Sequence, residues 1–323
     1  MIRIFKGYGC ELSGRMAELY EDLHLACHRL DGRSISTMCT SSQISKVITR
    51  LSLDDPLIMY NIEVRYKKDI FGKTSLEIVD PINKRERLSL RNRCMDSAKD
   101  ITSKCSRSHI LAEKYIHDYI CKNVRYDNTE PNAHSIVGPL LFKRGVCEGI
   151  SKTAKILFDM LNIDSSLVLG NLSTSNDNVW NSAWNNDGHA WNKVKIDGTW
   201  FHLDITSDLG LTRKNHIRYD YFNLSDTEVS KSHSVSLSTE SRCNLDKGGY
   251  YDLMGLAAGS ENDLLRILES SKGDSSVTFK INATSNWSPD RNKINSLCRM
   301  FFAGNRRHEI SHNSARNVYS IYL

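Results

Sequence analysis

The sequence predicts an α+β protein in which a helix that carries a cysteine packs on an antiparallel sheet. Three observations predict it. Segments with apolar residues at helical spacing alternate with segments rich in β-branched and aromatic residues. The dipeptide Asp197-Gly198 is a strong hairpin signal between two strand-like segments. Gly145 precedes a helical pattern, which places Cys147 in the first turn of a helix.

The amino-terminal part is expected to hold two helices and a hairpin. Apolar residues recur at helical spacing over 11–30 and again over 44–51, where an Asp-Asp-Pro sequence ends the pattern. Residues 57–66 and 74–79 are rich in β-branched and aromatic side chains, and a glycine between them suits a turn. We therefore predict a small α+β domain over residues 1–95.

The central part is expected to combine helices with a hairpin. Residues 97–123 predict one long helix or two, which end before a polar stretch. Strand-like segments follow at 166–170, 189–196 and 199–205, the last two joined by the Asp-Gly turn. Together with the cysteine-bearing helix, these elements predict a central α+β core over residues 96–230.

The remaining segments predict loops and a second small domain. The asparagine-rich stretch 173–187 is a long loop, either a lid beside a site or a mobile insertion. The polar, serine-rich region 222–248 is expected to be a loop or linker. Residues 249–323 show helix, strand, helix and strand patterns in turn, so residues 231–323 are predicted to be a linker and a carboxyl-terminal α+β domain.

Composition and charge exclude several classes of protein. The 323 residues include 43 Lys and Arg against 38 Asp and Glu, a formal charge of +5. Short basic groups such as Lys84–Arg93 lack the density of a nucleic-acid-binding surface, so we expect a solvated face and no nucleic acid. No apolar run approaches the length of a membrane span and no signal peptide opens the chain, which predicts a cytoplasmic protein.

The nine cysteines predict neither a disulfide framework nor a structural zinc site, because their count is odd and no two are spaced C-x-x-C. Most are interpreted as small buried hydrophobes in a reducing compartment. Only Cys147 has a context that suggests chemistry.

Cys147, His189 and Asp204 are the candidate catalytic residues. A helix amino terminus favours a thiolate, which needs an imidazole within reach and a third group that orients the ring. In a hairpin centred on Asp197-Gly198, position 189 pairs near 206. Position 204 is two places from that register and on the same sheet face, so its carboxylate could reach His189 diagonally, provided the helix with Cys147 packs on that face.

Other interpretations of these residues stay open. His202 shares a strand face with Asp204 and is the rival histidine. Cys147, His189, His202 and Asp204 could hold a metal by residue type, although their spacing matches no familiar zinc pattern. Trp191 is more often a core aromatic, and is the candidate substrate-binding residue if it lines the acyl site.

Three sequence blocks resemble a known family. They read GVCEGISKTA at 145–154, GHAWNKV at 188–194 and GTWFHLDIT at 198–206. Their residues and order resemble the transglutaminase-like superfamily, in particular its bacterial members, and flanking residues extend the resemblance across roughly 100–230.

The resemblance implies a papain-like core in which Cys147, His189 and Asp204 are the catalytic triad. It implies attack of the thiolate on an amide carbonyl of a protein or peptide, and a thioester that water or an amine resolves. The sequence has no acidic cluster that resembles the calcium sites of animal transglutaminases. It also lacks the C-x-x-C pairs of the zinc-bearing branch of the superfamily. We therefore expect no cofactor and no metal.

Two functions remain open. The first is an active peptidase, deamidase or transglutaminase. The alternative is a catalytically weak scaffold that binds a protein partner. An intact triad favours the enzyme, because a pure scaffold has no physical need for all three groups. Substrate identity and oligomeric state do not follow from the sequence.

Overall fold

The computed structural model describes residues 4–29, 34–59, 63–70, 73–79, 83–172, 188–213, 216–282, 287–301 and 309–322. Its residues divide into two compact units. The first comprises residues 1–171, 188–200 and 235–241, and the second comprises 172–187, 201–234 and 242–323. Each unit is described separately below.

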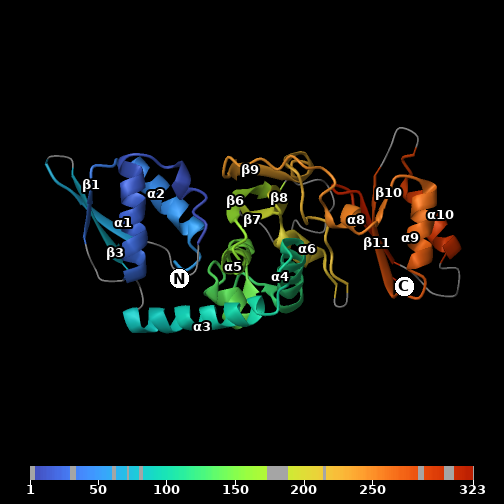
Figure 1. The fold of residues 1–323 in the computed structure, drawn as a ribbon, viewed down its shortest axis with the longest axis horizontal. Coiled ribbons are helices and arrows are strands. Elements are labelled where there is room, and N and C mark those ends of the chain that lie inside the picture. Colours follow the sequence, from blue (N-terminus) through green and yellow to red (C-terminus); the bar gives the residue numbers. More distant parts are fainter. Residues whose placement is uncertain are drawn as a thin grey trace. The chain divides into compact units, whose positions relative to one another are not determined.

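The amino-terminal part of the first unit packs two helices on a three-stranded sheet (Figure 1). The sheet has the antiparallel order β1-β3-β2. The predicted helices and hairpin are confirmed. Thr40 caps the second helix in a capping box with Gln43, and Leu23, Val47 and Leu76 lie at the centre of the core. The elements are η1 (Gly9–Glu11), α1 (Arg15–Arg29), β1 (Ile35–Thr37), α2 (Ser41–Asp54), β2 (Glu63–Lys68) and β3 (Thr74–Val79).

The helices of the central region surround the segment that leads to Cys147. The pattern over 97–123 corresponds to parts of two helices, because the polar residues 103–108 interrupt it. Asn83 caps the first of them, and its helix contains the basic group from Lys84. The elements are α3 (Lys84–Thr102), α4 (His109–Asn123), β4 (Arg125–Tyr126), η2 (Gly138–Phe142), β5 (Arg144–Gly145) and α5 (Cys147–Met160).

A four-stranded sheet has the order β8-β7-β6-β9, and helix α5 packs against its strand β7. Its strands are β6 (Ser165–Leu172), β7 (His189–Ile196), β8 (Thr199–Leu203) and β9 (His233–Leu237). Strands β6 and β7 are antiparallel, with Gly170 opposite His189. The first unit contains only Thr199 and Trp200 of β8 and residues 235–237 of β9. The predicted hairpin is present, and its Asp197 and Gly198 both have positive φ, as a primed turn requires.

The second unit ends in an α+β domain that matches the expected alternation. Its sheet has the order β10-β11-β13-β12, with α9 and α10 along one face (Figure 1). Phe279, Ile294 and Ile321 lie in the buried cluster between them. The elements of this unit are α6 (Ile205–Leu211), α7 (Asp226–Val229), α8 (Tyr250–Leu253), β10 (Ala257–Ala258), α9 (Glu261–Ser270), β11 (Ser276–Ile281), α10 (Arg291–Phe301), β12 (Glu309–Asn313) and β13 (Val318–Tyr322).

Two expectations about local structure are wrong. Residues 222–248 were expected to be loop, but they contain α7 and β9, together with the buried side chains of Val229, His233 and Cys243. The strand expected to reach residue 205 ends at Leu203, because Asp204 begins a helix. The predicted loop 173–187 lies outside the described residues.

Within the described ranges, every helix is too short or too polar to cross a bilayer.

Candidate active site

Cys147 is the first residue of α5, as predicted. Val146 is the helix N-cap, and its backbone N–H donates to the Ala133 carbonyl at 3.1 Å. The residue is buried, with an exposed fraction of 9%. The thiol therefore lies at the positive end of a 14-residue helix, where backbone N–H groups lack partners within the helix.

The glycines beside Cys147 are explained by close packing. A Cβ at Gly149 would lie 2.1 Å from the Ala133 carbonyl oxygen, and one at Gly145 would lie 2.7 Å from Cγ of Pro139. Any larger residue would push the 133–139 segment away from the start of α5. The glycines of the GVCEG block therefore hold the segment that surrounds the thiol.

His189 begins β7 in the same unit as Cys147. The residue is 4% exposed, and its ring stacks on that of Trp191, with centroids 5.7 Å apart and an interplanar angle of 21°. Trp191 itself is fully buried. The indole supports the His189 ring. A role for Trp191 in substrate binding stays a prediction.

Two hydrogen bonds fasten α5 to β7 beside these residues. Ser151 lies one turn after Cys147 on the same helix face. Its hydroxyl donates to the Ala190 carbonyl at 3.0 Å, and Asn192 Nδ2 donates to the Ser151 carbonyl at 3.0 Å. The helix with the cysteine is thus bonded to the residue next to His189. Ser151 therefore has a clear packing role.

Tyr126 contacts the backbone of Cys147, and the sequence analysis assigned it no role. It lies in β4, parallel to β5 and opposite Gly145. Burial raises the pKa of Tyr126, the negative charge of the ionised Cys147 side chain raises it further, and a hydrogen bond from the Cys147 backbone N–H lowers it. The phenol oxygen therefore occupies the acceptor position in front of that N–H. No sequence spacing signals this contact, since 21 residues separate the pair.

A compact charge group lies next to the thiol on α5. Glu148 contacts Lys152 at 2.7 Å and His134 at 2.9 Å. Burial by itself would raise the pKa of Glu148, but Lys152 and His134 together hold it below its usual range. The Glu148 charge is thus balanced locally, which limits its repulsion of a neighbouring thiolate.

Asp204 belongs to the second unit, where it is the N-cap of α6. It accepts a hydrogen bond from the Ser207 backbone N–H at 3.0 Å and another from the Ser207 hydroxyl. His233 Nε2 lies 2.9 Å from its Oδ2, and His233 Nδ1 contacts the Ser232 hydroxyl at 2.8 Å. The carboxylate is 2% exposed. His233 was missed because it falls in the segment expected to be a linker.

The rival histidine His202 has a different carboxylate partner. Its Nε2 lies 2.9 Å from Oδ1 of Asp226, whose Oδ2 accepts the Cys243 backbone N–H at 3.1 Å. The ring is nearly fully buried. His202 therefore helps to fix α7 through its contact with Asp226.

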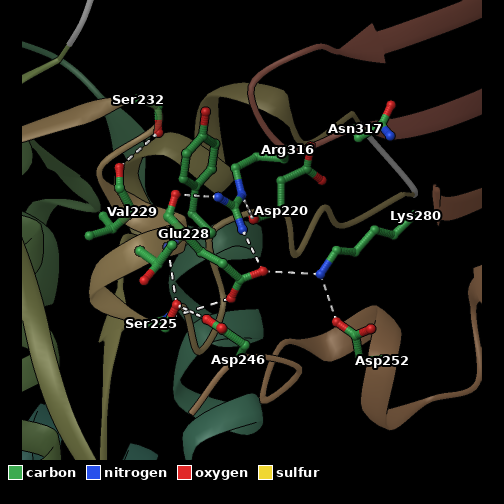
Figure 2. A network of polar contacts seen from close by, with 12 residues as sticks. Asp220, Ser225, Glu228, Val229, Ser232, Asp246, Asp252, Lys280, Arg316 and Asn317 are labelled. Atoms are coloured by element: carbon green, nitrogen blue, oxygen red, sulfur yellow. Dashed lines mark hydrogen bonds and ion pairs between the residues drawn. The ribbon is translucent and has the colours of Figure 1, made fainter. Parts of the chain in front are cut away.

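A buried ionic network holds the segment that leads to His233 (Figure 2). Arg316 contacts the Glu228 carboxylate at 3.2 Å and donates to its carbonyl at 2.6 Å and to that of Asp220 at 3.2 Å. Lys280 lies 3.1 Å from Glu228 and 2.8 Å from Asp252. The carboxyl-terminal domain is thus bonded to α7. The last residue of this helix lies four residues before His233 in the sequence.

The structure places Cys147 and His189 in one unit, and Asp204 and His233 in the other. The first pair is linked through Ser151 and Ala190, whereas the second pair is in direct contact. A three-residue arrangement of Cys147, His189 and Asp204 stays a prediction.

Comparison with known proteins agrees with the motif pattern. The model of the transglutaminase-like superfamily matches residues 96–205. This span contains the Cys147 helix, strand β7 and Asp204. The central region is a transglutaminase-like domain. Its mixed helices and antiparallel sheet are those of an α+β, papain-like core.

Three solved structures have low similarity to this chain. A transglutaminase shares 17% identity over 58% of this chain and 54% of its own, with a TM-score of 0.31. A candidate cysteine protease from Cytophaga hutchinsonii shares 16% identity over 58% of this chain and 68% of its own, with a TM-score of 0.30. A candidate protease from Parabacteroides distasonis shares 14% identity over 45% of this chain and 36% of its own, with a TM-score of 0.25. The chain spans about half the length of the first structure. No curated protein matches it.

Proposed function

We propose that this protein is a cysteine-dependent acyl-transfer enzyme that acts on amide bonds of proteins or peptides. Cys147 is the nucleophile, His189 the general base and acid, and Asp204 the group that orients His189. The observation that carries the proposal is the position of Cys147 at the start of α5, fastened by Ser151 to the backbone beside His189.

In the proposed reaction, His189 takes the Cys147 proton and the sulfur attacks the amide carbon. The carbonyl oxygen becomes an oxyanion, and the C–N bond breaks when the imidazolium protonates the leaving amine. A thioester remains. Water then releases an acid, as in peptidases and deamidases, whereas an amine forms a new amide, as in transglutaminases.

Cys147 N–H and Tyr126 O–H are proposed as the donors to the oxyanion. The phenol oxygen lies at the N–H of Cys147, so a substrate carbonyl that displaces it meets both groups. Each donor would stabilise charge only as it develops in the transition state.

The setting proposed for this chemistry is a reducing, cytoplasmic one. All nine cysteines are free thiols, and seven of them are buried. An oxidising compartment would threaten the thiolate that the reaction requires.

The test is the rate of alkylation of Cys147 by iodoacetamide against pH, followed by mass spectrometry in the wild type and in His189→Ala. We expect wild-type Cys147 to react well below about pH 8.5, the ordinary thiol range, and the variant to lose this reactivity. Cys10, an exposed free thiol, is the internal reference in every sample. An ordinary titration in both proteins would contradict the enzyme proposal.

The alternative is a catalytically weak scaffold that binds a protein partner. A primary-amine probe and an ammonia assay, applied to the same peptide library, separate amine transfer from hydrolysis. An activated Cys147 that forms no thioester with any peptide would favour the scaffold.

A further inference from the structure

Three metal-ligating side chains converge in the amino-terminal domain, in a place that the proposed reaction does not use. His24 and His28 lie on α1, and Asp55 follows the last residue of α2. The Nε2 atoms of both rings face the same oxygen, Oδ2 of Asp55, at 2.7 Å for His24 and 2.5 Å for His28. The three donor atoms all lie within 4.8 Å of one another.

The backbone fixes this convergence. His24 and His28 are four residues apart, so one face of a single helix presents both rings. Their ring centroids are 4.9 Å apart in an edge arrangement. Asp55 Oδ1 accepts the Leu57 backbone N–H at 2.9 Å, which leaves Oδ2 directed at the two rings. One carboxylate oxygen is therefore shared by two imidazoles.

The burial pattern suits an ion that arrives from solvent. The Asp55 side chain is 1% exposed, whereas those of His24 and His28 are 19% and 27% exposed. The carboxylate thus forms the floor of the group, and the rings form its accessible rim. Three protein ligands with one open side are the arrangement in which zinc keeps a water molecule as fourth ligand.

The donor set selects a class of metal. Two imidazole nitrogens and one carboxylate oxygen suit Zn²⁺ and its transition-metal neighbours, whereas Mg²⁺ and Ca²⁺ prefer oxygen ligands only. Bonds of about 2.0–2.1 Å in a tetrahedral site separate the donor atoms by about 3.3 Å. Each ring must therefore withdraw from Asp55 by less than about 1 Å, which its partial exposure permits.

We propose that His24, His28 and Asp55 form a binding site for a zinc-type divalent cation. The ion would join α1 to the end of α2. Asp54, the preceding residue, accepts the backbone N–H groups of Tyr8 and Gly9 at 3.0 and 2.8 Å. The ion would thus stabilise the turn to which the amino-terminal segment is attached.

The experiment compares zinc stoichiometry in the full-length wild type and in the variant His24→Gln/His28→Gln, by competition with a chromophoric chelator. We expect the variant to bind one equivalent less. The matched control is His109→Gln/His134→Gln, which removes two solvent-accessible imidazoles elsewhere in the first unit and should keep the wild-type stoichiometry. Equal stoichiometry in all three proteins would overturn the proposal.

Two further measurements of metal binding use the wild type and need no substitution of the three proposed metal-binding residues. Cobalt(II) at this site should give the absorption of a four-coordinate ion without a thiolate charge-transfer band, which separates it from metal bound by any cysteine. Zinc, but not magnesium, should protect His24 and His28 of the wild type from diethylpyrocarbonate, as mapped by mass spectrometry. Modification of both histidines at the same rate with and without zinc would overturn the proposal, whatever the variants do.

Discussion

The hydroxyl of Tyr126 and the backbone of Cys147 meet at the point where the proposed reaction develops charge. Tyr126→Phe removes the hydroxyl and keeps the ring. We expect kcat to fall by about 10²-fold with little change in KM, because an oxyanion donor acts mainly in the transition state. Tyr115→Phe, on α4, is the control and should keep full activity. An unchanged kcat in Tyr126→Phe would remove this residue from the mechanism.

The contact between His233 and Asp204 raises the question of which histidine is the base. In His233→Gln the amide can still donate to the carboxylate, so we expect a loss of less than about tenfold in kcat. Asp204→Asn should cost about 10⁴-fold, as expected when a histidine loses the carboxylate that sets its tautomer. Steady-state kinetics decide between the histidines. A large loss in His233→Gln with a mild one in His189→Gln would assign the base to His233.

For single residues, the sequence predicted the positions of those that lie inside compact motifs. Cys147 was placed correctly because a glycine, a helix start and an apolar pattern are all local signals. Tyr126 and His233 were missed because their contacts depend on tertiary packing, which no fixed spacing reports. Asp204 was expected on a strand, which was wrong, since an aspartate also caps helices.

Among the elements, β11 contacts the segment after α6 through a half-buried histidine. His216 Nδ1 lies 2.8 Å from the Ser276 hydroxyl, and Nε2 contacts that of Thr278. Burial lowers the pKa of His216, and so do the charges of Arg218 and Arg213, against the opposite effect of Asp220. The folded protein therefore binds this proton less readily than the unfolded chain does.

The direction in which pH changes the free energy of unfolding follows from this difference in proton affinity. The unfolded histidine takes up a proton near about pH 6.5, and the folded one only at lower pH. The free energy of unfolding should therefore fall as the pH drops below about 6.5. Urea titrations across this range should show a flatter profile in His216→Gln, whereas His109→Gln should keep the wild-type slope. Equal slopes in all three proteins would contradict this account.

Long periodic elements were predictable, and short ones were not. Helices α1, α2, α5, α9 and α10 and strands β7, β11 and β13 follow apolar patterns that local physics explains. Helix α6 has only seven residues and contains a glycine, so its pattern is too weak to recognise. Strand β9 escaped notice because three of its five residues are exposed and polar neighbours surround it.

For the molecule as a whole, the network around Glu228 ties the carboxyl-terminal domain to α7. Arg316→Met would leave Glu228 buried with one cation fewer. We expect a loss of about 3–5 kcal/mol in the free energy of unfolding, measured by urea denaturation. Lys293→Met breaks an exposed pair with Glu261 and should cost less than about 1 kcal/mol. Similar costs for the two variants would show that the network adds little.

The division of the chain into units was less accessible to sequence reasoning than its elements were. Composition suggested a linker near residue 230, because polar residues gather there. Residues 235–241 instead belong to the first unit, where Lys193 donates to the Ser241 carbonyl at 2.6 Å. Contacts between distant segments define the units, and composition does not report them.

Within residues 188–282, apart from 214 and 215, the chain passes three times from one unit to the other, after residues 200, 234 and 241. Consequently, a protease that cuts once does not yield one intact unit and one discarded tail. A cut after Trp200 gives a fragment 201–323 that still contributes residues 235–237 of β9 to the sheet of the first unit. The two pieces should therefore copurify without a covalent link, and separately expressed halves should be able to reconstitute the protein.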